Sequence, residues 1–253
     1  MAFVLSLTMA KKEIVPYIWK KTNKKIQVKN MFDRISSYYD LINRMISWRL
    51  DILWRKKVAS ILTPEKPKKI LDIATGTGDL AIALVKTNAN EIVGIDISEK
   101  MLEIGLKKVK NRKLSDKIVM EFGDSENINY PDNYFDAATI AFGVRNFEDL
   151  DKGLSEVHRV LHRGGNLVVL ETSVPQKFPI REFYNFYSHK IMPLIGSLFS
   201  HDKFAYRYLS ASAAEFPFGS SFNNILMKNG FINVKNLPQT FGVVSIYCAK
   251  KPY

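Results

Sequence analysis

The sequence predicts an α/β fold in which a doubly wound parallel sheet carries an N-terminal helical cap and a late helical insertion. Between residues 63 and 172, short apolar runs typical of strands alternate with amphipathic segments typical of helices. A glycine-rich turn, Gly76-Thr77-Gly78, follows the first of these strands. After Thr172 the alternation stops and a segment rich in aromatic residues begins.

The first 62 residues are expected to form a basic leader and a helical cap. Apolar residues recur every three or four positions between residues 30 and 62, which indicates helix. The stretch from Thr63 to Pro67 breaks this pattern, so the sheet core is expected to begin there.

Residues 63–172 are expected to form most of the core. Ser98 has the position of an N-cap at the start of the second helix. We expect strands at 69–74, 91–96, 118–122, 135–141 and 166–171, and helices at 80–86, 98–112 and 150–161. This order predicts parallel strands with helices on both faces of the sheet.

The chain after Thr172 is expected to leave the core and then return to it. Residues 173–218 are helical in pattern and aromatic, and are expected to form a lid over a ligand. A helix at 221–229 and two closing strands, at 231–237 and 241–249, complete the core within residues 219–253.

Composition limits the class of protein. A chain of 253 residues with 46% apolar residues suits one domain with a large core. The single cysteine, Cys248, excludes a disulfide framework and a cysteine-based zinc site, and it indicates a reducing compartment. The four histidines have no metal-ligand spacing, so no metal is expected. No run approaches the roughly 20 apolar residues that span a bilayer, so we expect a cytoplasmic protein.

The net charge of +12 is concentrated near the N-terminus, where seven lysines stand against Glu13 between Lys11 and Lys29. Such a segment suits nucleic acid, an anionic membrane surface, or plain solvation. No recognisable nucleic-acid module accompanies the charge, so we expect no nucleic-acid partner. Peripheral contact with the inner face of the membrane stays open, and so does the oligomeric state.

The glycine turn admits more than one ligand. Gly76, Gly78 and Ala81 fit the loose dinucleotide pattern G-x-G-x-x-G/A, and Asp96 lies 20 residues after Gly76, where an acid would bind a ribose. An NAD enzyme is therefore a rival interpretation, and glycines that only shape a tight turn are another. A Walker A loop is excluded because no G-K-[ST] follows Gly78.

Three features favour S-adenosylmethionine as the ligand. Asp72 lies inside the first strand, where a buried carboxylate needs a partner such as the donor's ammonium group. Asp79 adds negative charge beside the turn, which suits a sulfonium better than a pyrophosphate. Asp124 and Ser125 follow the third strand, where they can bind an adenine edge, while Asp96 binds the ribose hydroxyls.

Several longer motifs resemble one family. The resemblance rests on the motifs LDIATGTGDL, GIDIS, FGDSENINYPDNYFD, FGVRN followed by RVL-x-x-GG, LVVLE, IMPLIGSL and YRYLSAS. With these motifs the sequence resembles the ubiquinone/menaquinone biosynthesis C-methyltransferases, the UbiE/MenG family. The resemblance runs from about Val28 to Ala249. It implies a class I methyltransferase fold, Rossmann-like, with seven strands of which the last is antiparallel.

The resemblance also implies a reaction and a set of binding residues. The reaction is transfer of a methyl group from S-adenosylmethionine to a ring carbon of a polyprenylated quinol. The family's donor-binding positions fall on Thr77, Asp96, Asp124 and Ser125. A further family position is Ala141, where some relatives carry serine. The family pattern S-x-G-x-H reads Ser47-Trp48-Arg49-Leu50-Asp51 here, so a histidine-based role is not expected at that position.

The candidate catalytic residues are Arg145, Asn146 and Asp40. Arg145 and Asn146 follow the fourth strand, at the sheet edge where such folds bind ligands. We expect Arg145 to stabilise a developing phenolate and Asn146 to orient the ring; the alternative is that Arg145 braces the loop by pairing with Glu148 or Asp149. Asp40 is a candidate proton acceptor, with an exposed structural position as the alternative.

The acceptor is expected to meet aromatic side chains. Tyr39 of the cap and Tyr184 and Tyr187 of the insertion are candidate contacts for a planar ring and an isoprenoid tail. The pair Asp124-Ser125, where ubiquinone-type relatives often have Asn-Ala, favours demethylmenaquinol as the acceptor. A ubiquinone precursor (2-polyprenyl-6-methoxy-1,4-benzoquinol) or another small molecule remains the alternative.

Overall fold

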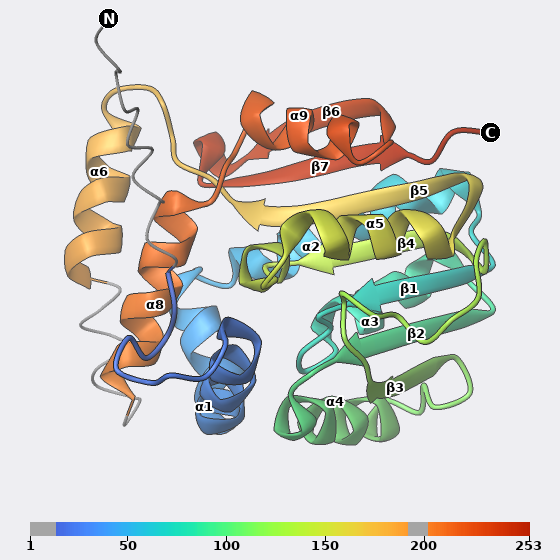
Figure 1. Cartoon of the computed structure of the whole chain (residues 1–253), viewed down its shortest axis with the longest axis horizontal. Helices are drawn as coiled ribbons and strands as arrows, with labels where there is room; N and C mark the ends of the chain where they lie inside the picture. The colour runs from blue at the N-terminus through green and yellow to red at the C-terminus, as the bar shows by residue number, and fades with distance from the viewer. Residues whose placement is uncertain (1–13, 192–201) are drawn as a thin grey trace, which may run out of the picture.

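A computed structural model describes residues 14–191 and 202–253, which fold around a seven-stranded sheet (Figure 1). The strand order is β3-β2-β1-β4-β5-β7-β6. The strands are β1 (Lys69–Ile73), β2 (Glu91–Asp96), β3 (Ile118–Phe122), β4 (Phe135–Ala141), β5 (Leu161–Thr172), β6 (Ile232–Gln239) and β7 (Val244–Lys250). Strands β1 to β5 pair in parallel, and β7 is antiparallel to both β5 and β6. The predicted fold class is confirmed, including the antiparallel last strand.

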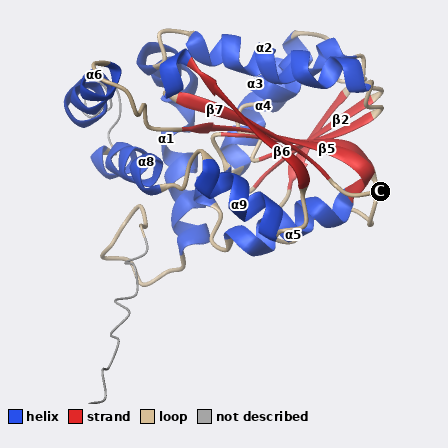
Figure 2. Cartoon of the chain, turned by 90° about the horizontal axis from the view of Figure 1, so that it is seen from above, coloured by secondary structure: helices blue, strands red, loops and turns tan. Residues whose placement is uncertain are grey.

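Helices cover both faces of the sheet (Figure 2). One face carries α2 (Leu50–Leu62), α3 (Asp79–Leu84) and α4 (Glu99–Asn111), and the other carries α5 (Leu150–Val160) and α9 (Ser220–Lys228). Successive residues of a strand point to opposite faces, so Ile70 joins the core under α2 and Leu71 joins the core under α5. As predicted, Ser98 caps α4, and its hydroxyl accepts a hydrogen bond from the Met101 amide (3.3 Å).

A third group of helices stands at one end of the sheet: α1 (Lys24–Ile46), α6 (Ile180–Phe186) and α8 (Lys203–Glu215) (Figure 1). Met31 and Ile35 of α1 share a buried core with Ala205 and Tyr206 of α8. The N-terminal helix and the late insertion therefore pack together, although they are far apart in the sequence. Helix α2, which the predicted division groups with the cap, packs on the sheet instead.

Local geometry differs from the prediction at three places. The closing strand predicted at 241–249 begins only at Val244, because a 3-10 turn occupies Thr240–Gly242. The helical segment 30–62 divides into α1 and α2 because Trp48 and Arg49 adopt left-handed conformations, with φ of 52° and 63°. Strand β5 begins at Leu161, directly after α5, and not at residue 166. The register against β4 shifts near its start, and Gly164, at φ 77°, accommodates that irregularity.

Short helical turns complete the described chain. Turns of 3-10 helix span Thr63–Glu65, Val85–Thr87, Val144–Asn146 and Thr240–Gly242, and a π-helical turn spans Tyr187–Ile191. Among the helices of residues 14–191 and 202–253, none is both long and apolar enough to cross a membrane. The first 13 residues of the basic leader and the IGSL motif at 195–198 lie outside the described residues.

Candidate active site

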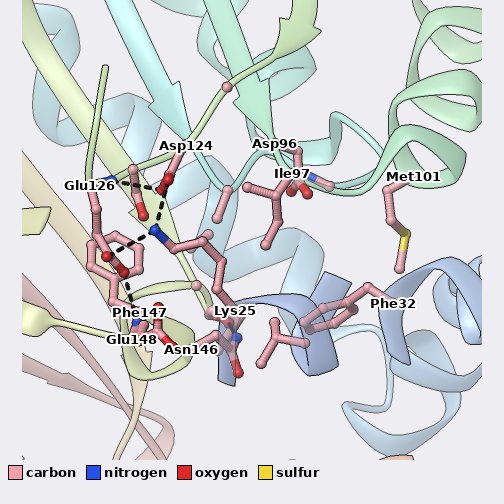
Figure 3. Close-up of a pocket in the computed structure, with 18 of the residues that line it drawn as sticks. Lys25, Phe32, Asp96, Ile97, Met101, Asp124, Glu126, Asn146, Phe147 and Glu148 are labelled. Carbon is pink, nitrogen blue, oxygen red and sulfur yellow. Dashed lines mark hydrogen bonds and ion pairs between the residues drawn. The ribbon is translucent and has the colours of Figure 1, made fainter. Parts of the chain in front are cut away.

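Two cavities lie where the parallel strands end and the helical cap begins. The first, which we call the strand-edge cavity, lies between the ends of β1 to β4 and helix α1 (Figure 3). Its lining includes Lys25, Phe32, Tyr39, Gly76, Asp96, Asp124, Ser125, Glu126, Ala141, Phe142, Asn146 and Glu148. The second, the aromatic cavity, lies between α1, α2, α6 and α8 and has a volume of about 440 Å³.

Within the glycine turn, Gly76 lines the strand-edge cavity, whereas Gly78, also predicted to bind the donor, lies outside its lining. Gly76 and Gly78 have φ of 56° and 77°, a conformation that glycine adopts without steric cost. A Cβ atom on Gly78 would lie 3.1 Å from the sulfur of Met120, so this position also needs the small residue for space. No atom lies within 4 Å of a Cβ placed on Gly76, so the backbone there is open to a ligand.

Asp96 stands at the end of β2 and faces the strand-edge cavity. Its two oxygens accept hydrogen bonds from the Gly76 amide (2.8 Å) and the Ser98 amide (2.8 Å). Burial raises the pKa of Asp96 to about 6, although these hydrogen bonds act in the opposite direction. The carboxylate therefore gains from any further donor, such as a ribose hydroxyl.

Lys25 of α1 closes the opposite wall and was not among the predicted site residues. Its ammonium group lies 2.7 Å from Asp124 and 3.0 Å from Glu126 (Figure 3). The Glu126 carboxylate also accepts a hydrogen bond from the Glu148 amide (2.8 Å). In the sequence, Lys25 is one of several lysines in a basic segment, and no local pattern distinguishes it from the others.

The lining of the strand-edge cavity is acidic. Four carboxylates line the cavity, those of Asp96, Asp124, Glu126 and Glu148. Among the described residues that line it, Lys25 is the single lysine or arginine. Such a lining suits a ligand that carries an ammonium and a sulfonium group, and it repels a pyrophosphate. The chemistry of this lining therefore fits S-adenosylmethionine better than a nicotinamide dinucleotide.

Asp72 lies outside this lining, although it was a candidate contact of the donor. Its oxygens accept hydrogen bonds from the hydroxyls of Thr75 (2.6 Å) and Thr139 (2.7 Å). Burial raises the pKa of Asp72 to about 6, while the two hydroxyls act to lower it. The two threonine hydroxyls supply the partners that this buried carboxylate requires. Asp72 therefore does not need the donor's ammonium group, contrary to the prediction.

Thr77 and Asp40 also lie outside the lining of both cavities. The Thr77 hydroxyl donates to Asp40 (2.6 Å) and accepts from Lys108 (2.9 Å), and Lys108 also pairs with Asp40 (2.6 Å). Asp40 is therefore paired with a cation and does not face the acceptor cavity, contrary to the role expected for a proton acceptor.

The negative charge of Asp79, which was expected to disfavour a pyrophosphate beside the glycine turn, is compensated by cations. Its carboxylate pairs with Lys108 (2.7 Å) and with Arg44. Burial alone would raise the pKa of Asp79, but the neighbouring cations, led by Lys108, bring it below its usual value. These cations compensate the negative charge beside the glycine turn, so Asp79 does not exclude a pyrophosphate there. The acidic lining of the strand-edge cavity is the feature that disfavours a pyrophosphate.

The contacts of Lys108 tie α4 to α1 and α3, which yields a prediction about stability. Lys108→Met should lower the free energy of unfolding by about 1–3 kcal/mol, because Asp40 and Asp79 would lose a shared cation in a partly buried site. Lys107→Met is the matched control, since Lys107 is exposed on the same helix, and it should change stability by less than about 0.5 kcal/mol. Chemical denaturation measures both, and equal effects would contradict the proposed tie.

The aromatic cavity brings together the candidate acceptor residues. Tyr39, Tyr184 and Tyr187 all line it, as does Arg145. Burial raises the pKa of Tyr39 and of Tyr184, so both phenols stay protonated and can donate hydrogen bonds. The Tyr187 hydroxyl donates to the Ile46 carbonyl (2.8 Å), which joins the insertion to α1.

The two cavities share two lining residues, Tyr39 and Phe142. A ligand in the strand-edge cavity and a ligand in the aromatic cavity would therefore meet between these rings. The site thus combines a polar, acidic compartment with an apolar one, as transfer between two unlike ligands requires.

Arg145 and Asn146 belong to different cavities. The Arg145 guanidinium lines the aromatic cavity and pairs with Glu171, which is completely buried. Its partner is thus neither Glu148 nor Asp149, the acids considered in the sequence. Asn146 lines the strand-edge cavity, where its oxygen accepts from the Tyr208 hydroxyl (3.1 Å). Asn146 does not line the aromatic cavity, so it is not placed to orient a ring bound there.

Glu171 is a residue that sequence reasoning missed. Its Oε1 atom accepts from Arg145 and from the Thr172 amide (2.7 Å). Within the described residues, its Oε2 atom and the Nε atom of Arg145 are buried without a hydrogen-bond partner. An acid at the end of an otherwise apolar strand, in LVVLE, was the available signal.

The segment Ser47–Asp51 explains how the chain departs from the S-x-G-x-H pattern. Arg49 has a left-handed φ of 63°, the conformation that a glycine adopts most readily. Asp51 stands where the pattern has histidine, and it pairs with Arg44 and with Arg55 (2.6 Å). In residues 14–191 and 202–253, no group of His, Cys, Asp and Glu side chains could hold a metal ion.

Comparisons with known proteins agree with this geometry. The model of the ubiE/COQ5 methyltransferase family matches residues 20–251. A demethylmenaquinone methyltransferase of Bacteroides fragilis is 44% identical over 226 residues, which cover 89% of this chain and 92% of that protein. A ubiquinone/menaquinone biosynthesis C-methyltransferase UbiE of Geobacter sulfurreducens is 38% identical over 236 residues, 92% of each chain.

Solved structures support the fold. A possible histamine N-methyltransferase of Thermotoga maritima, a SAM-dependent methyltransferase, superposes with a TM-score of 0.60 at 20% identity, covering 88% of this chain and 99% of that one. The [4+2]-cyclase SpnF superposes with a TM-score of 0.63 at 17% identity, covering 91% and 97%. Because a cyclase has the same fold, the fold alone does not determine the reaction.

The family match extends over nearly the whole chain, including the cap and the insertion that form the aromatic cavity. It confirms the predicted class of enzyme, a methyltransferase that uses S-adenosylmethionine. The rival interpretation, an NAD-dependent oxidoreductase, is wrong. The chain belongs to the ubiE/COQ5 methyltransferase family.

Proposed function

We propose that the protein methylates a ring carbon of a polyprenylated quinol and that demethylmenaquinol is its acceptor. The observation that carries the proposal is the junction of the acidic strand-edge cavity with the aromatic cavity at Tyr39 and Phe142. The relatives named demethylmenaquinone methyltransferase, at up to 44% identity, support this acceptor.

The strand-edge cavity is the proposed site of the methyl donor. S-adenosylmethionine, when bound, supplies an electrophilic methyl group attached to a sulfonium. Asp96 would accept hydrogen bonds from the ribose hydroxyls, and Asp124 and Ser125 would bind the adenine edge. Because Lys25 pairs with Asp124, binding of the adenine requires this lysine to move aside or to share the carboxylate.

The aromatic cavity is the proposed site of the quinol ring. Its aromatic side chains favour a planar aromatic acceptor over a sugar or a peptide. The protein's main task is alignment, with the ring carbon held about 3–3.5 Å from the methyl group. Tyr39 lies at the junction, where its phenol can donate a hydrogen bond to a ring oxygen.

Arg145 would activate the acceptor. A guanidinium beside a ring hydroxyl lowers the hydroxyl's pKa and stabilises the phenolate, which makes the adjacent ring carbon more nucleophilic. Glu171 acts on the reaction through Arg145, because its carboxylate holds the guanidinium in the cavity wall. We therefore propose Glu171 as a positioning residue. Asp40 is not proposed as the proton acceptor, since it is paired with Lys108; the one proton that the quinol loses on methylation would pass to solvent water.

A ubiquinone precursor is the second candidate acceptor, because relatives named UbiE are 38–40% identical to this chain. A mass-spectrometric assay separates the two. Purified protein and S-adenosylmethionine are mixed with reduced short-chain demethylmenaquinone, and a parallel sample contains the benzoquinol precursor.

We expect a mass gain of one methyl group with the naphthoquinol and little or none with the benzoquinol. A gain with both acceptors would indicate dual specificity. If donor binding is measurable and neither acceptor gains mass, the quinol proposal is wrong.

A further inference from the structure

The surface around the mouth of the aromatic cavity carries exposed aromatic side chains. We call them the aromatic rim: Trp48, Phe178, Phe183, Phe186 and Phe241, each between 60% and 80% exposed. Trp48 and Phe183 also line the cavity, so the rim is continuous with its opening. Large aromatic side chains grouped in this way are uncommon on surfaces that face only water, and they mark an interaction site.

The rim comes from three segments that are distant in the sequence. Trp48 lies in the turn between α1 and α2, Phe241 lies in the turn between β6 and β7, and the other three belong to α6 and the residues before it. Helix α6 stands at the outer edge of the molecule (Figure 1), and within the described chain none of its residues is fully buried, although Tyr184 is partly buried.

Hydrogen bonds join these segments. The Trp54 indole, six residues after Trp48, donates to the Thr240 hydroxyl (2.9 Å), and Tyr187 donates to the Ile46 carbonyl (2.8 Å). The rim therefore forms only in the folded protein, where these three segments come together.

Two rim residues adopt conformations that bulky side chains rarely adopt. Trp48 and Phe241 have φ of 52° and 57°, in the left-handed region. Each is among the most exposed of the large hydrophobic side chains in the described residues. An unfavourable backbone combined with exposure of a large aromatic ring costs stability without any gain in packing, which indicates a functional role.

Basic side chains accompany the rim. Arg49, Lys177 and Lys190 are exposed on the same segments, and Arg181 pairs with Glu182, the one acid between residues 172 and 191. Aromatic rings with lysines and arginines beside them suit the interface of a bilayer that contains anionic lipid.

The N-terminal lysines are less available for such contact. Lys24 donates to the Phe147 carbonyl (2.6 Å), Lys25 pairs with Asp124 (2.7 Å), and Lys29 pairs with Asp33 (2.9 Å). Of the five lysines between residues 14 and 29, these three are thus engaged with the protein itself. This distribution favours the rim over the leader as a membrane contact.

We propose that the aromatic rim docks the protein on an anionic bilayer, with the mouth of the aromatic cavity facing the lipid. The inference rests on the proposed function, because a polyprenylated acceptor is held in the bilayer by its tail. The rim rings would enter the interfacial region while the basic side chains contact the lipid phosphates. The quinol ring would then enter the cavity as its tail stays among the acyl chains.

The test compares vesicles of phosphatidylcholine with vesicles that also contain phosphatidylglycerol. The rim variant is Phe178→Ser with Phe241→Ser, two residues that do not line either cavity. The control variant is Ile18→Ser with Leu106→Ser, two exposed apolar residues from other parts of the chain. A leader variant, Lys20→Gln with Lys21→Gln, tests the competing contact. Flotation measures binding, and methyl transfer is assayed with a short-chain quinol in solution and a long-chain quinol in the vesicles.

We expect the rim variant to lose at least about tenfold in binding to anionic vesicles and in turnover of the embedded quinol, while turnover of the soluble quinol is unchanged. The control should match the wild type. Unchanged binding by the rim variant, or loss confined to the leader variant, would overturn the proposal. If the wild type binds through the rim but methylates neither quinol, the docking surface stands and the proposed acceptor is wrong.

Discussion

Arg145→Met should reduce turnover by about 10²–10³-fold, the usual effect of removing a group that stabilises a developing anion. The affinity for S-adenosylmethionine should stay within about threefold of the wild type, because Arg145 lines the aromatic cavity and not the strand-edge cavity. Single-turnover kinetics and calorimetric binding measure the two quantities separately.

This substitution leaves Glu171 as a buried carboxylate without its cation, which would also destabilise the fold. The double variant Arg145→Met with Glu171→Gln removes both charges and is expected to fold and remain inactive. Arg145→Lys keeps the charge but loses the planar group, so partial activity is expected.

The pH profile provides a readout that a purely structural role would not change. Without Arg145, turnover should rise with pH toward the pKa of a free phenol, about 10, because the ring hydroxyl must then ionise unaided. The wild-type profile should level off at lower pH. Turnover of the folded double variant within about threefold of the wild type would rule out the proposed role of Arg145.

The affinity for S-adenosylmethionine should depend on pH through Asp96. Burial raises the pKa of this carboxyl in the free protein to about 6. The proposed bonds to the ribose hydroxyls require the ionised form, so a proton competes with the donor when the pH falls below this value. We expect a constant Kd above about pH 7 and a Kd that increases by up to about tenfold per pH unit below pH 6.

Two variants identify the group responsible. Asp96→Asn should bind the donor about 10–100-fold more weakly at neutral pH, the value of one or two charge-assisted hydrogen bonds, and should lose the pH dependence. Asp124→Asn should also bind more weakly but should keep the dependence, because Asp96 is intact. Wild-type affinity that is flat between pH 5 and pH 8 would contradict the assignment.

The glycine turn shows how far local sequence information reaches. Gly76 and Gly78 were expected to bring the backbone close to a ligand, and both have the left-handed φ that such a turn needs. Asp96, Asp124 and Ser125 were expected at the same place, and all three line the strand-edge cavity. These predictions agree with the structure because parallel strands end at one edge, so residues that follow them meet there.

Pairing between charges was the part that the sequence did not predict. Asp40, Thr77 and Asp79 were treated as residues that face a ligand, but Lys108 of α4 contacts all three. Lys25 contacts Asp124 across 99 positions of the sequence. No periodicity links such residues, because a helical or strand pattern describes only the neighbours within one element.

The sequence by itself determined the order of strands and helices, the glycine turn, the acids at the strand ends and the family to which the chain belongs. Those features depend on local periodicity and on short motifs, which can be recognised without knowing which elements touch. The tertiary structure decided that α1 and α8 share a core, that Arg145 pairs with Glu171, and that the two cavities meet at Tyr39 and Phe142. Each of these contacts joins segments that only packing of the helical cap against the end of the sheet brings together.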